Sequence, residues 1–265
     1  MLTRMQIQRL AQRNHIGMQV QERDYLQRLL LLLLYARTQT LFFKGGTALR
    51  LVYHGTRYSE DLDFSAQQGE GSSGASARRI ALHTLWQTVI IDLRDFGIES
   101  EIRNIRETEQ ALSFEVSYQG PLYDGRDRSK GKVRIDISLR DELTAVRREL
   151  VHSEYDDVRP FVVTVLTPEH LLAEKVRALL VRSKPRDLYD VWLMVEQGVP
   201  LHVDLVAQKL KLYDMTLEKT AVESALARAR ADWERDLRPL LAQYVDPQMT
   251  DGVAAMLCQL VTGQR

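Results

Sequence analysis

Two aspartates in the segment SEDLDFS have the spacing of a metal site. Asp61 and Asp63 lie in a stretch that alternates charged and apolar residues, as a half-buried β-strand does. Residues i and i+2 of a strand project from the same face about 6 to 7 Å apart, so both carboxylates can reach one metal ion. Magnesium usually binds one or two carboxylates together with phosphate oxygens. The pair therefore indicates a Mg²⁺ site that a nucleotide completes, although an Asp-x-Asp pair alone is more often a solvated strand face.

The segment KGGTALRL, just before this strand, is the second candidate element. It places Gly45 and Gly46 ahead of a short predicted helix. A glycine pair lets the backbone approach a phosphate closely, and a helix N-terminus adds free N–H groups. We expect Gly45, Gly46 and Thr47 to hold the triphosphate of a nucleotide. A paired glycine alone is more often an ordinary turn, but the order and close spacing of the two segments favour a nucleotide site.

A third carboxylate is predicted from the strand KGKVRIDISL. Its alternation places Lys130, Lys132, Arg134 and Asp136 on one face and the apolar residues on the other. Asp136 is the leading candidate for a third metal ligand. The three basic residues would then be a track for the phosphates of an acceptor nucleic acid, a contact independent of sequence and sensitive to salt. Without the first motif, an amphipathic strand with a solvated face is the better interpretation.

Two more candidates lie in the C-terminal part of the chain. Lys175 stands inside the apolar stripe of TPEHLLAEKVRALLVR, where a lysine either extends to solvent or reaches a cleft and binds the β and γ phosphates. In PRDLYDVWLM, Asp187 lies at the edge of the apolar face and can point into the same cleft. Asp190 lies farther round, and we interpret it as structural, in an i, i+4 ion pair with Arg186.

The elements that must position these residues are mixed helices and strands. A polar Gly- and Ser-rich stretch, 67–77, predicts a mobile loop after the acidic strand. We place a domain boundary near residue 160, with a catalytic domain at 1–160 and a helical domain at 161–265 that contributes Lys175 and Asp187 to the cleft. Thr167 with Pro168, and later Pro185, mark helix starts. The expected helices before the boundary are 21–35, 47–53 and 79–96, and the expected strands are 41–43, 61–65, 98–105, 111–119, 130–139 and 162–166.

Composition narrows the class of protein. Lys plus Arg and Asp plus Glu both number 36, so any nucleic-acid contact must come from a local patch. The single cysteine excludes an internal disulfide and fits a reducing cytosol. The most apolar stretch, 29–34, is far shorter than the roughly 20 residues of a membrane span. No histidine or cysteine has zinc-ligand spacing and no serine lies in a Gly-x-Ser-x-Gly elbow, so we expect a cytoplasmic protein without zinc or triad chemistry.

Four blocks in this order resemble the AbiEii and MenT type nucleotidyltransferase toxins: FKGGTALRLVYHGTRYSEDLDFS, RIDI, TPEHLLAEKVRALLVR and the following SKPRDLYDVW. The resemblance covers residues 42–194. It implies an α+β fold of the DNA polymerase beta type, a mixed sheet with flanking helices and a helical C-terminal portion. Where many nucleotidyltransferases have Gly-Ser this chain has Gly-Gly-Thr, which leaves Thr47 or Ser59 to supply a hydroxyl near the phosphates. Carried over residue by residue, the resemblance matches Gly45, Gly46, Ser59, Asp61 and Asp63 to the nucleotide and metal motifs, Lys175 to the motif lysine and Asp187 to the last acidic motif. We therefore expect nucleotide binding by Lys44, Gly45, Gly46, Thr47, Ser59 and Lys175, and catalytic roles for Asp61, Asp63, Asp136, Lys175 and Asp187.

The function that the resemblance implies is that of a toxin in a bacterial toxin–antitoxin or abortive-infection system. Its relatives move a nucleotide from an NTP to the 3′ acceptor end of tRNA, which blocks translation, and they are paired with an antitoxin that is often a winged-helix regulator. In the mechanism we expect, Asp61, Asp63 and Asp136 bind Mg²⁺ and Lys175 holds pyrophosphate. Two rival hypotheses are an NTP-dependent modifier of a protein hydroxyl and a nucleotide-binding protein without turnover.

Overall fold

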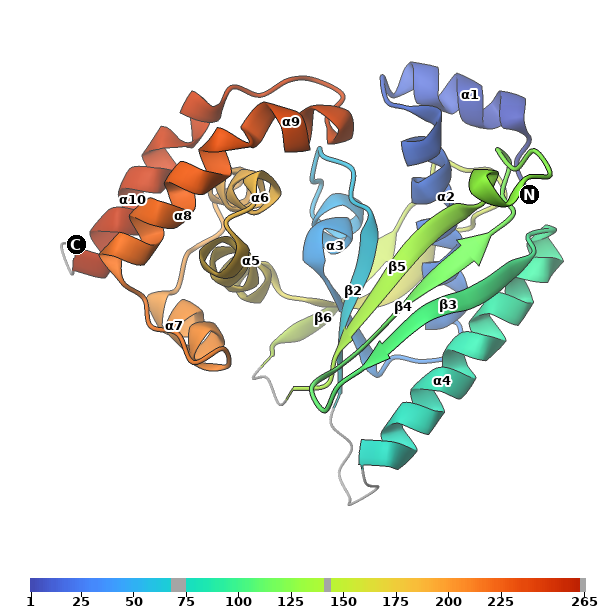
Figure 1. Ribbon diagram of the computed structural model, residues 1–265, viewed down its shortest axis with the longest axis horizontal. Helices are drawn as coiled ribbons and strands as arrows, with labels where there is room; N and C mark the ends of the chain where they lie inside the picture. Colours follow the sequence, from blue (N-terminus) through green and yellow to red (C-terminus); the bar gives the residue numbers. More distant parts are fainter. Residues whose placement is uncertain (68–74, 141–143, 263–265) are drawn as a thin grey trace. The chain divides into compact units, whose positions relative to one another are not determined.

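A mixed seven-stranded sheet organises the first part of the chain (Figure 1). The computed structural model describes residues 1–67, 75–140 and 144–262. Within them the strand order is β3-β4-β5-β2-β1-β7-β6, and the predicted α+β class is confirmed. The strands are β1 (Leu41–Lys44), β2 (Asp61–Ala66), β3 (Ser100–Glu107), β4 (Ala111–Tyr118), β5 (Gly131–Ser138), β6 (Val146–Val151) and β7 (Phe161–Leu166).

The chain divides into two compact units, which we describe separately. The first holds the sheet and runs to Val165, apart from Gly55–Arg57 and a short segment after β5. The second begins at Leu166, takes in Gly55–Arg57 and contains the helices that follow β7.

The centre of the sheet is formed by β1, β2 and β5. β2 is antiparallel to β1 and parallel to β5, while β3, β4 and β5 form the antiparallel meander expected from their alternation. β6 was not predicted. Its sequence, VRRELV, lies at an edge of the sheet and places two exposed arginines in succession, so it lacks the alternation by which the other strands were found.

Helices pack against the sheet and against one another. They are α1 (Arg4–Arg13), which packs on α2 (Met18–Tyr35), and α2, α3 (Gly45–Val52) and α4 (Ala75–Asp92), which contact the strands; α4 continues into the 3₁₀ turn η1 (Leu93–Phe96). Trp86 of α4 packs against Phe64 of β2 and Phe114 of β4, with ring centroids 6.0 and 5.3 Å apart. Most of the predicted loop, residues 68–74, lies outside the described residues, and its last residues begin α4.

The second unit is built around α5 (Pro168–Arg182), which packs against α6 (Pro185–Glu196), α7 (Val203–Lys211) and α8 (Lys219–Ala231). The starts of α5 and α6 at Pro168 and Pro185 are as predicted. The chain continues through α9 (Trp233–Leu237) and α10 (Asp251–Thr262). Among the described residues, no helix combines the length and apolar character that a membrane crossing requires.

Candidate active site

The three predicted metal-site aspartates lie on one face of the sheet. β2 and β5 pair in parallel with Asp63 opposite Asp136 and Asp61 opposite Arg134. Neighbouring strands are about 4.8 Å apart, so Asp63 and Asp136 are direct neighbours. The intervening residues of both strands are buried on the other face. β1 adds Lys44 directly opposite Asp63, so Lys44, Asp63 and Asp136 form a row across three strands. We call these three residues, together with Asp61, the carboxylate row.

Arg134 lies among these carboxylates. Its Nε is 2.9 Å from Asp136 Oδ2. The hydrogen bond to Asp136 is the main reason why the pKa of Arg134 is raised, and the charges of Asp61 and Asp63 add to the effect. The sequence predicted this arginine as a phosphate contact. In the structure it balances the negative charge of the row.

The donor chemistry of the row fits Mg²⁺, because its side chains offer the hard oxygen ligands that this ion prefers. Within the part of the chain that the structure describes, no three acidic, histidine or cysteine side chains converge as a ready ligand set. The Asp136 carboxylate is turned onto Arg134. Because that pair is partly exposed, with 50% and 33% of the two side chains accessible, exchange of Arg134 for a cation requires only a local side-chain change.

The glycine turn lies directly against Asp63. Gly45 begins α3 with a φ of +80°, a left-handed conformation that favours glycine. A Cβ at this position would be 2.0 Å from Asp63 Oδ2 and 2.7 Å from its Cγ. A side chain at position 45 would therefore displace the Asp63 carboxylate. Glycine at this position lets the turn and the acidic strand lie in direct contact.

The structure distinguishes the two hydroxyls that the sequence left open. Thr47 is fully buried, and its Oγ1 donates to the backbone oxygen of Asp61 at 2.5 Å. This bond ties α3 to β2. Ser59 is only half-buried, which leaves it the more accessible of the two for a phosphate.

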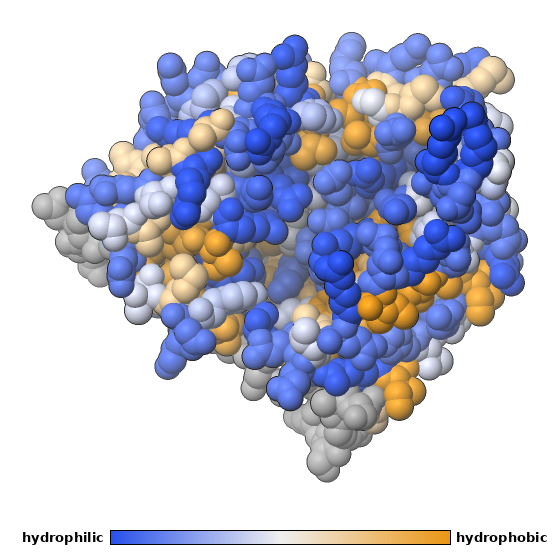
Figure 2. Space-filling model, in the orientation of Figure 1, coloured by the Kyte–Doolittle hydropathy of each residue, from blue (hydrophilic) through white to orange (hydrophobic). Residues whose placement is uncertain are grey.

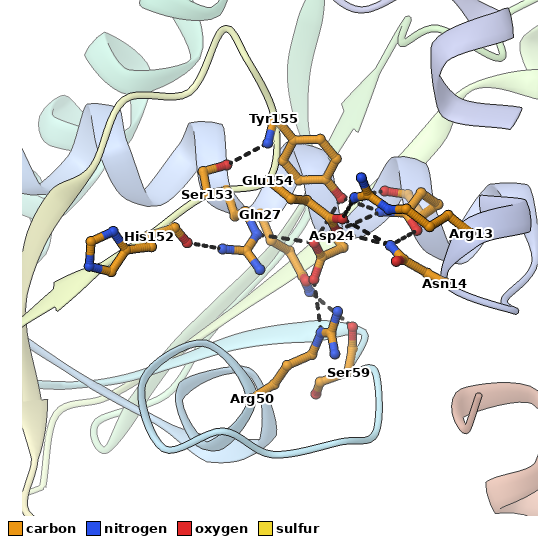
Figure 3. Close-up of polar contacts among 12 residues, drawn as sticks. Arg13, Asn14, Asp24, Gln27, Arg50, Ser59, His152, Ser153, Glu154 and Tyr155 are labelled. Atoms are coloured by element: carbon orange, nitrogen blue, oxygen red, sulfur yellow. Dashed lines mark hydrogen bonds and ion pairs between the residues drawn. The ribbon is translucent and has the colours of Figure 1, made fainter. Parts of the chain in front are cut away.

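A buried polar network behind α3 was not predicted (Figure 3). Asp24 of α2 is 2% exposed and accepts hydrogen bonds from Arg28 at 3.1 Å, Arg50 at 3.0 Å and the Tyr155 hydroxyl at 2.8 Å. Burial alone would raise the pKa of Asp24, but the two arginines outweigh it and the pKa is lowered. Arg50 belongs to α3 and also lies over the Tyr58 ring, 3.5 Å from its centroid. The network therefore fixes the helix whose N-terminus carries the glycine turn.

The same network reaches two further segments. Gln27 of α2 donates to the backbone oxygen of Ser59 at 3.2 Å. Glu154, in the segment after β6, accepts from Asn14 at 3.0 Å and pairs with Arg13 of α1. The sequence signal that could have indicated the network is the set of polar residues at the start of α2, at positions where an amphipathic helix would bury apolar ones.

In the second unit, Lys175 and Asp190 form a buried cluster with Arg57. Arg57 Nε and Nη2 donate to the two Asp190 oxygens at 2.7 and 2.6 Å, and Lys175 Nζ lies 2.7 Å from Oδ2. Asp190 is 0% and Lys175 4% exposed. Burial acts to raise the pKa of Asp190, but Arg57 and Lys175 lower it. The expected Arg186–Asp190 pair is wrong, because the partners of Asp190 come from distant parts of the sequence, and Lys175 does not extend to solvent.

Asp187, the other candidate on α6, is also completely buried. It accepts two hydrogen bonds from the Arg182 guanidinium, both at 2.7 Å. Asp187 and Arg182 thus connect the first turn of α6 to the end of α5. Lys175 therefore lies next to Asp190, and Asp187 lies next to Arg182. All four residues belong to α5 and α6.

Comparisons with known proteins gave one family match and several solved structures of similar fold. Residues 29–255 match the family model described as nucleotidyl transferase AbiEii toxin, type IV TA system. MenT4, a nucleotidyltransferase toxin from Mycobacterium tuberculosis H37Rv, is similar in structure with a TM-score of 0.61 and 19% identity, covering 99% of this chain and 90% of that one. JHP933 from Helicobacter pylori has a TM-score of 0.59 at 20% identity, over 94% of this chain and 96% of that one. No curated protein matches the chain.

Proposed function

Because the chain belongs to the AbiEii nucleotidyltransferase toxin family of type IV toxin–antitoxin systems, we propose that it uses Mg²⁺ to transfer a nucleotide from an NTP to the 3′ acceptor end of tRNA. The observation that supports this most directly is the in-register row of Lys44, Asp63 and Asp136 with Gly45 against Asp63. It joins a candidate phosphate-binding turn to a candidate metal-binding strand within one short segment.

In this proposal, Asp61, Asp63 and Asp136 hold Mg²⁺. When bound, the ion neutralises phosphate charge and lowers the pKa of a coordinated hydroxyl. The backbone N–H groups of Gly45 and Gly46 bind phosphate oxygens of the NTP. Lys44, opposite Asp63, adds a positive charge beside the same phosphates.

The transfer itself is an in-line displacement at the α-phosphorus. The acceptor 3′-oxygen forms a bond to this phosphorus, the bond to the bridging β-phosphate oxygen breaks, and pyrophosphate leaves with the electron pair. Asp136 is the carboxylate nearest the basic strand face and orients the acceptor hydroxyl, whose proton passes to solvent. Arg134, released from Asp136, faces the incoming phosphates as a bidentate donor.

Lys175 and Asp187 retain their proposed roles as the phosphate-binding lysine and the last acidic residue of the family motif. Their ion pairs give both a second role inside the helical unit. Lys175 would have to exchange Asp190 for a phosphate oxygen to hold pyrophosphate, and Arg57 keeps Asp190 neutralised when this exchange takes place.

The biological setting follows from the family. A type IV toxin implies a cognate antitoxin, which we propose to be a winged-helix regulator, and we place the protein in the cytoplasm, where tRNA is found.

The test is incubation of the purified protein with Mg²⁺, each α-labelled NTP in turn, and total tRNA. An Asp63→Asn variant, which preserves size beside Gly45, is the matched control. We expect label on tRNA with at least one NTP and none with the variant. Label on protein instead of tRNA would support a protein hydroxyl as the acceptor, and binding of NTP with no labelled product would support a protein without turnover.

A further inference from the structure

A pocket of about 470 Å³ lies in the first unit at the start of β5, away from the glycine turn. α1, α2, the end of β4 and the segment that precedes β5 line it. Figure 2 shows hydrophilic side chains gathered at the upper right, over the 3₁₀ turn η2 (Asp127–Ser129) and the start of β5. The volume of the pocket is within the range of about 300–1,000 Å³ that is typical of ligand pockets.

Positive charge dominates the lining. Arg4, Arg23, Arg128, Lys130 and Lys132 all contribute, against two carboxylates, Glu22 and Asp124. The whole chain has no net charge. A surface that binds anions must therefore come from a local concentration of basic side chains, and this pocket has one.

The two carboxylates are already engaged. Glu22 is 4% exposed and accepts from the backbone N–H of Leu122 at 2.6 Å, which makes it part of the pocket wall. Asp124 accepts from the backbone N–H of Arg126 at 3.1 Å and pairs with the Arg126 side chain. Asp124 is therefore turned to Arg126, which does not line the pocket, whereas Glu22 offsets part of the charge of Arg4 and Arg23 and leaves the lining with an excess of positive charge.

Two of the basic side chains pair with carboxylates that are at least partly exposed. Lys130 lies 2.8 Å from Asp127 and 3.2 Å from Glu101, which are 73% and 47% exposed, and Lys132 is 3.8 Å from Glu115, which is 30% exposed. Exposed ion pairs of this kind are weak, so a phosphate can replace the carboxylate at little cost. For Arg128 the structure shows no carboxylate within salt-bridge distance among the residues it describes.

β5 connects the pocket to the carboxylate row. Lys132 and Asp136 lie on the same face of this strand, four residues apart, a separation of about 13 Å at roughly 3.3 Å per residue. With a rise of about 3.4 Å per nucleotide in a helical strand, the pocket is about four nucleotides from Asp136. A polynucleotide whose 3′ end reacts at Asp136 would therefore extend towards the pocket.

We propose that this pocket binds the phosphate backbone of the acceptor nucleic acid a few nucleotides from its reacting 3′ end. This inference rests on the proposed function, because it assumes an acceptor strand that ends at the carboxylate row. It gives α1 and the start of α2, for which the sequence offered no motif, a part in acceptor binding through Arg4 and Arg23. The contact is to phosphates, so it selects nucleic acid as a class and no particular sequence.

The experiment compares Arg4→Glu and Arg128→Glu with Arg148→Glu. Arg148 is an exposed arginine on β6, at the sheet edge opposite the meander, so the control makes the same charge change elsewhere. Both pocket side chains are exposed, and Glu in the first turn of α1 suits the helix dipole, so folding should be preserved. The readout is the anisotropy of a fluorescent RNA minihelix that ends in a free 3′ single strand, measured at several NaCl concentrations.

We expect each pocket variant to bind the minihelix about tenfold more weakly than the wild type, with the slope of log affinity against log salt reduced by about 1. Arg148→Glu should differ from the wild type by less than about twofold. In transfer assays the KM for RNA should rise while kcat and the KM for NTP stay unchanged. The proposal would be overturned by pocket variants that bind the minihelix as tightly as Arg148→Glu does, or by a wild type that does not bind it.

The same measurements separate this inference from the proposed function. A wild type that binds RNA through the pocket but adds no label to it would contradict tRNA nucleotidyl transfer and leave the pocket as a nucleic-acid site. A wild type that labels tRNA, with pocket variants equally active at low RNA concentration, would contradict only the pocket.

Discussion

The carboxylate row and the Asp190 cluster use the same residue types in opposite ways. In the row, Asp136 and Arg134 are partly exposed, and Arg134 Nε and Nη2 donate to the two Asp136 oxygens at 2.9 and 3.1 Å. In the cluster, Asp190 is fully buried and both its oxygens are bound by Arg57 and Lys175. A partly exposed pair exchanges partners easily, whereas a buried, fully bonded carboxylate leaves buried positive charge behind when it is removed. Burial therefore separates Asp136, whose partner can be exchanged, from Asp190, whose partners hold the helical unit together.

The largest effect should come from Asp190→Ala. It leaves Arg57 and Lys175 buried without their carboxylate, so we expect the free energy of unfolding to fall by about 3–5 kcal/mol. Urea unfolding followed by circular dichroism measures this. Asp136→Ala is the matched control and should cost less than about 1 kcal/mol. Equal losses in the two variants would remove the distinction between the row and the cluster.

Gly45→Ala should abolish most activity while the protein stays folded. The new Cβ would displace the Asp63 carboxylate, so we expect transfer to fall by at least about 100-fold, equivalent to roughly 2.7 kcal/mol. Gly97→Ala is the control, because Gly97 also has a positive φ, +72°, but nothing within 4 Å of the new Cβ. Both variants should lose about 1–2 kcal/mol of stability from backbone strain. Similar losses of activity in Gly45→Ala and Gly97→Ala would show that the contact between position 45 and Asp63 does not cause the loss.

Stability should fall in acid because Asp24 and Asp190 have lowered pKa values in the folded protein. A carboxyl with a depressed folded pKa contributes stability that is present above its unfolded pKa, 3.8, and is lost as pH falls through the folded value. The free energy of unfolding, measured by urea titration, should therefore decrease below about pH 4, by about 1.4 kcal/mol for each unit of pKa difference. Asp24→Asn and Asp190→Asn should each flatten this dependence, and an unchanged acid profile in both would contradict the assignment.

The smallest effect on stability should come from Arg134→Gln. Its pair with Asp136 is half exposed, so we expect a change in unfolding free energy below about 1 kcal/mol. Its effect on metal binding should be larger, because the guanidinium no longer competes for the carboxylates. Isothermal titration with Mg²⁺ in the absence of RNA should give tighter binding than in the wild type. Weaker binding would show that Arg134 supports the metal site instead of competing with it.

The sequence predicted those features that depend on local periodicity. The alternation around Asp61 and Asp63 placed them on one strand face, and Thr167 with Pro168 marked the start of α5 correctly. The row itself could be inferred because RIDI alternates in the same way. These signals extend over a few residues, which is the range at which strand and helix geometry acts.

The polar clusters could not be predicted in this way. Asp24 and Arg50 are 26 residues apart, and Arg57 and Asp190 are 133 apart. Nothing in the periodicity of either segment indicates which distant charge it will meet, so Asp190 was assigned the nearest partner on its own helix. Burial of a charged residue becomes visible only when the chain has folded around it.

The position of Arg134 also bears on how the protein is made. Many metal sites are folding requirements, because carboxylates that repel one another come together only around the ion. Here the guanidinium supplies positive charge from within the chain, next to Asp136 and close enough to Asp61 and Asp63 to be influenced by their charges. The carboxylates therefore do not depend on a divalent ion to offset their repulsion as the chain folds, and in the proposed function the metal and the nucleotide would bind to a chain that is already folded.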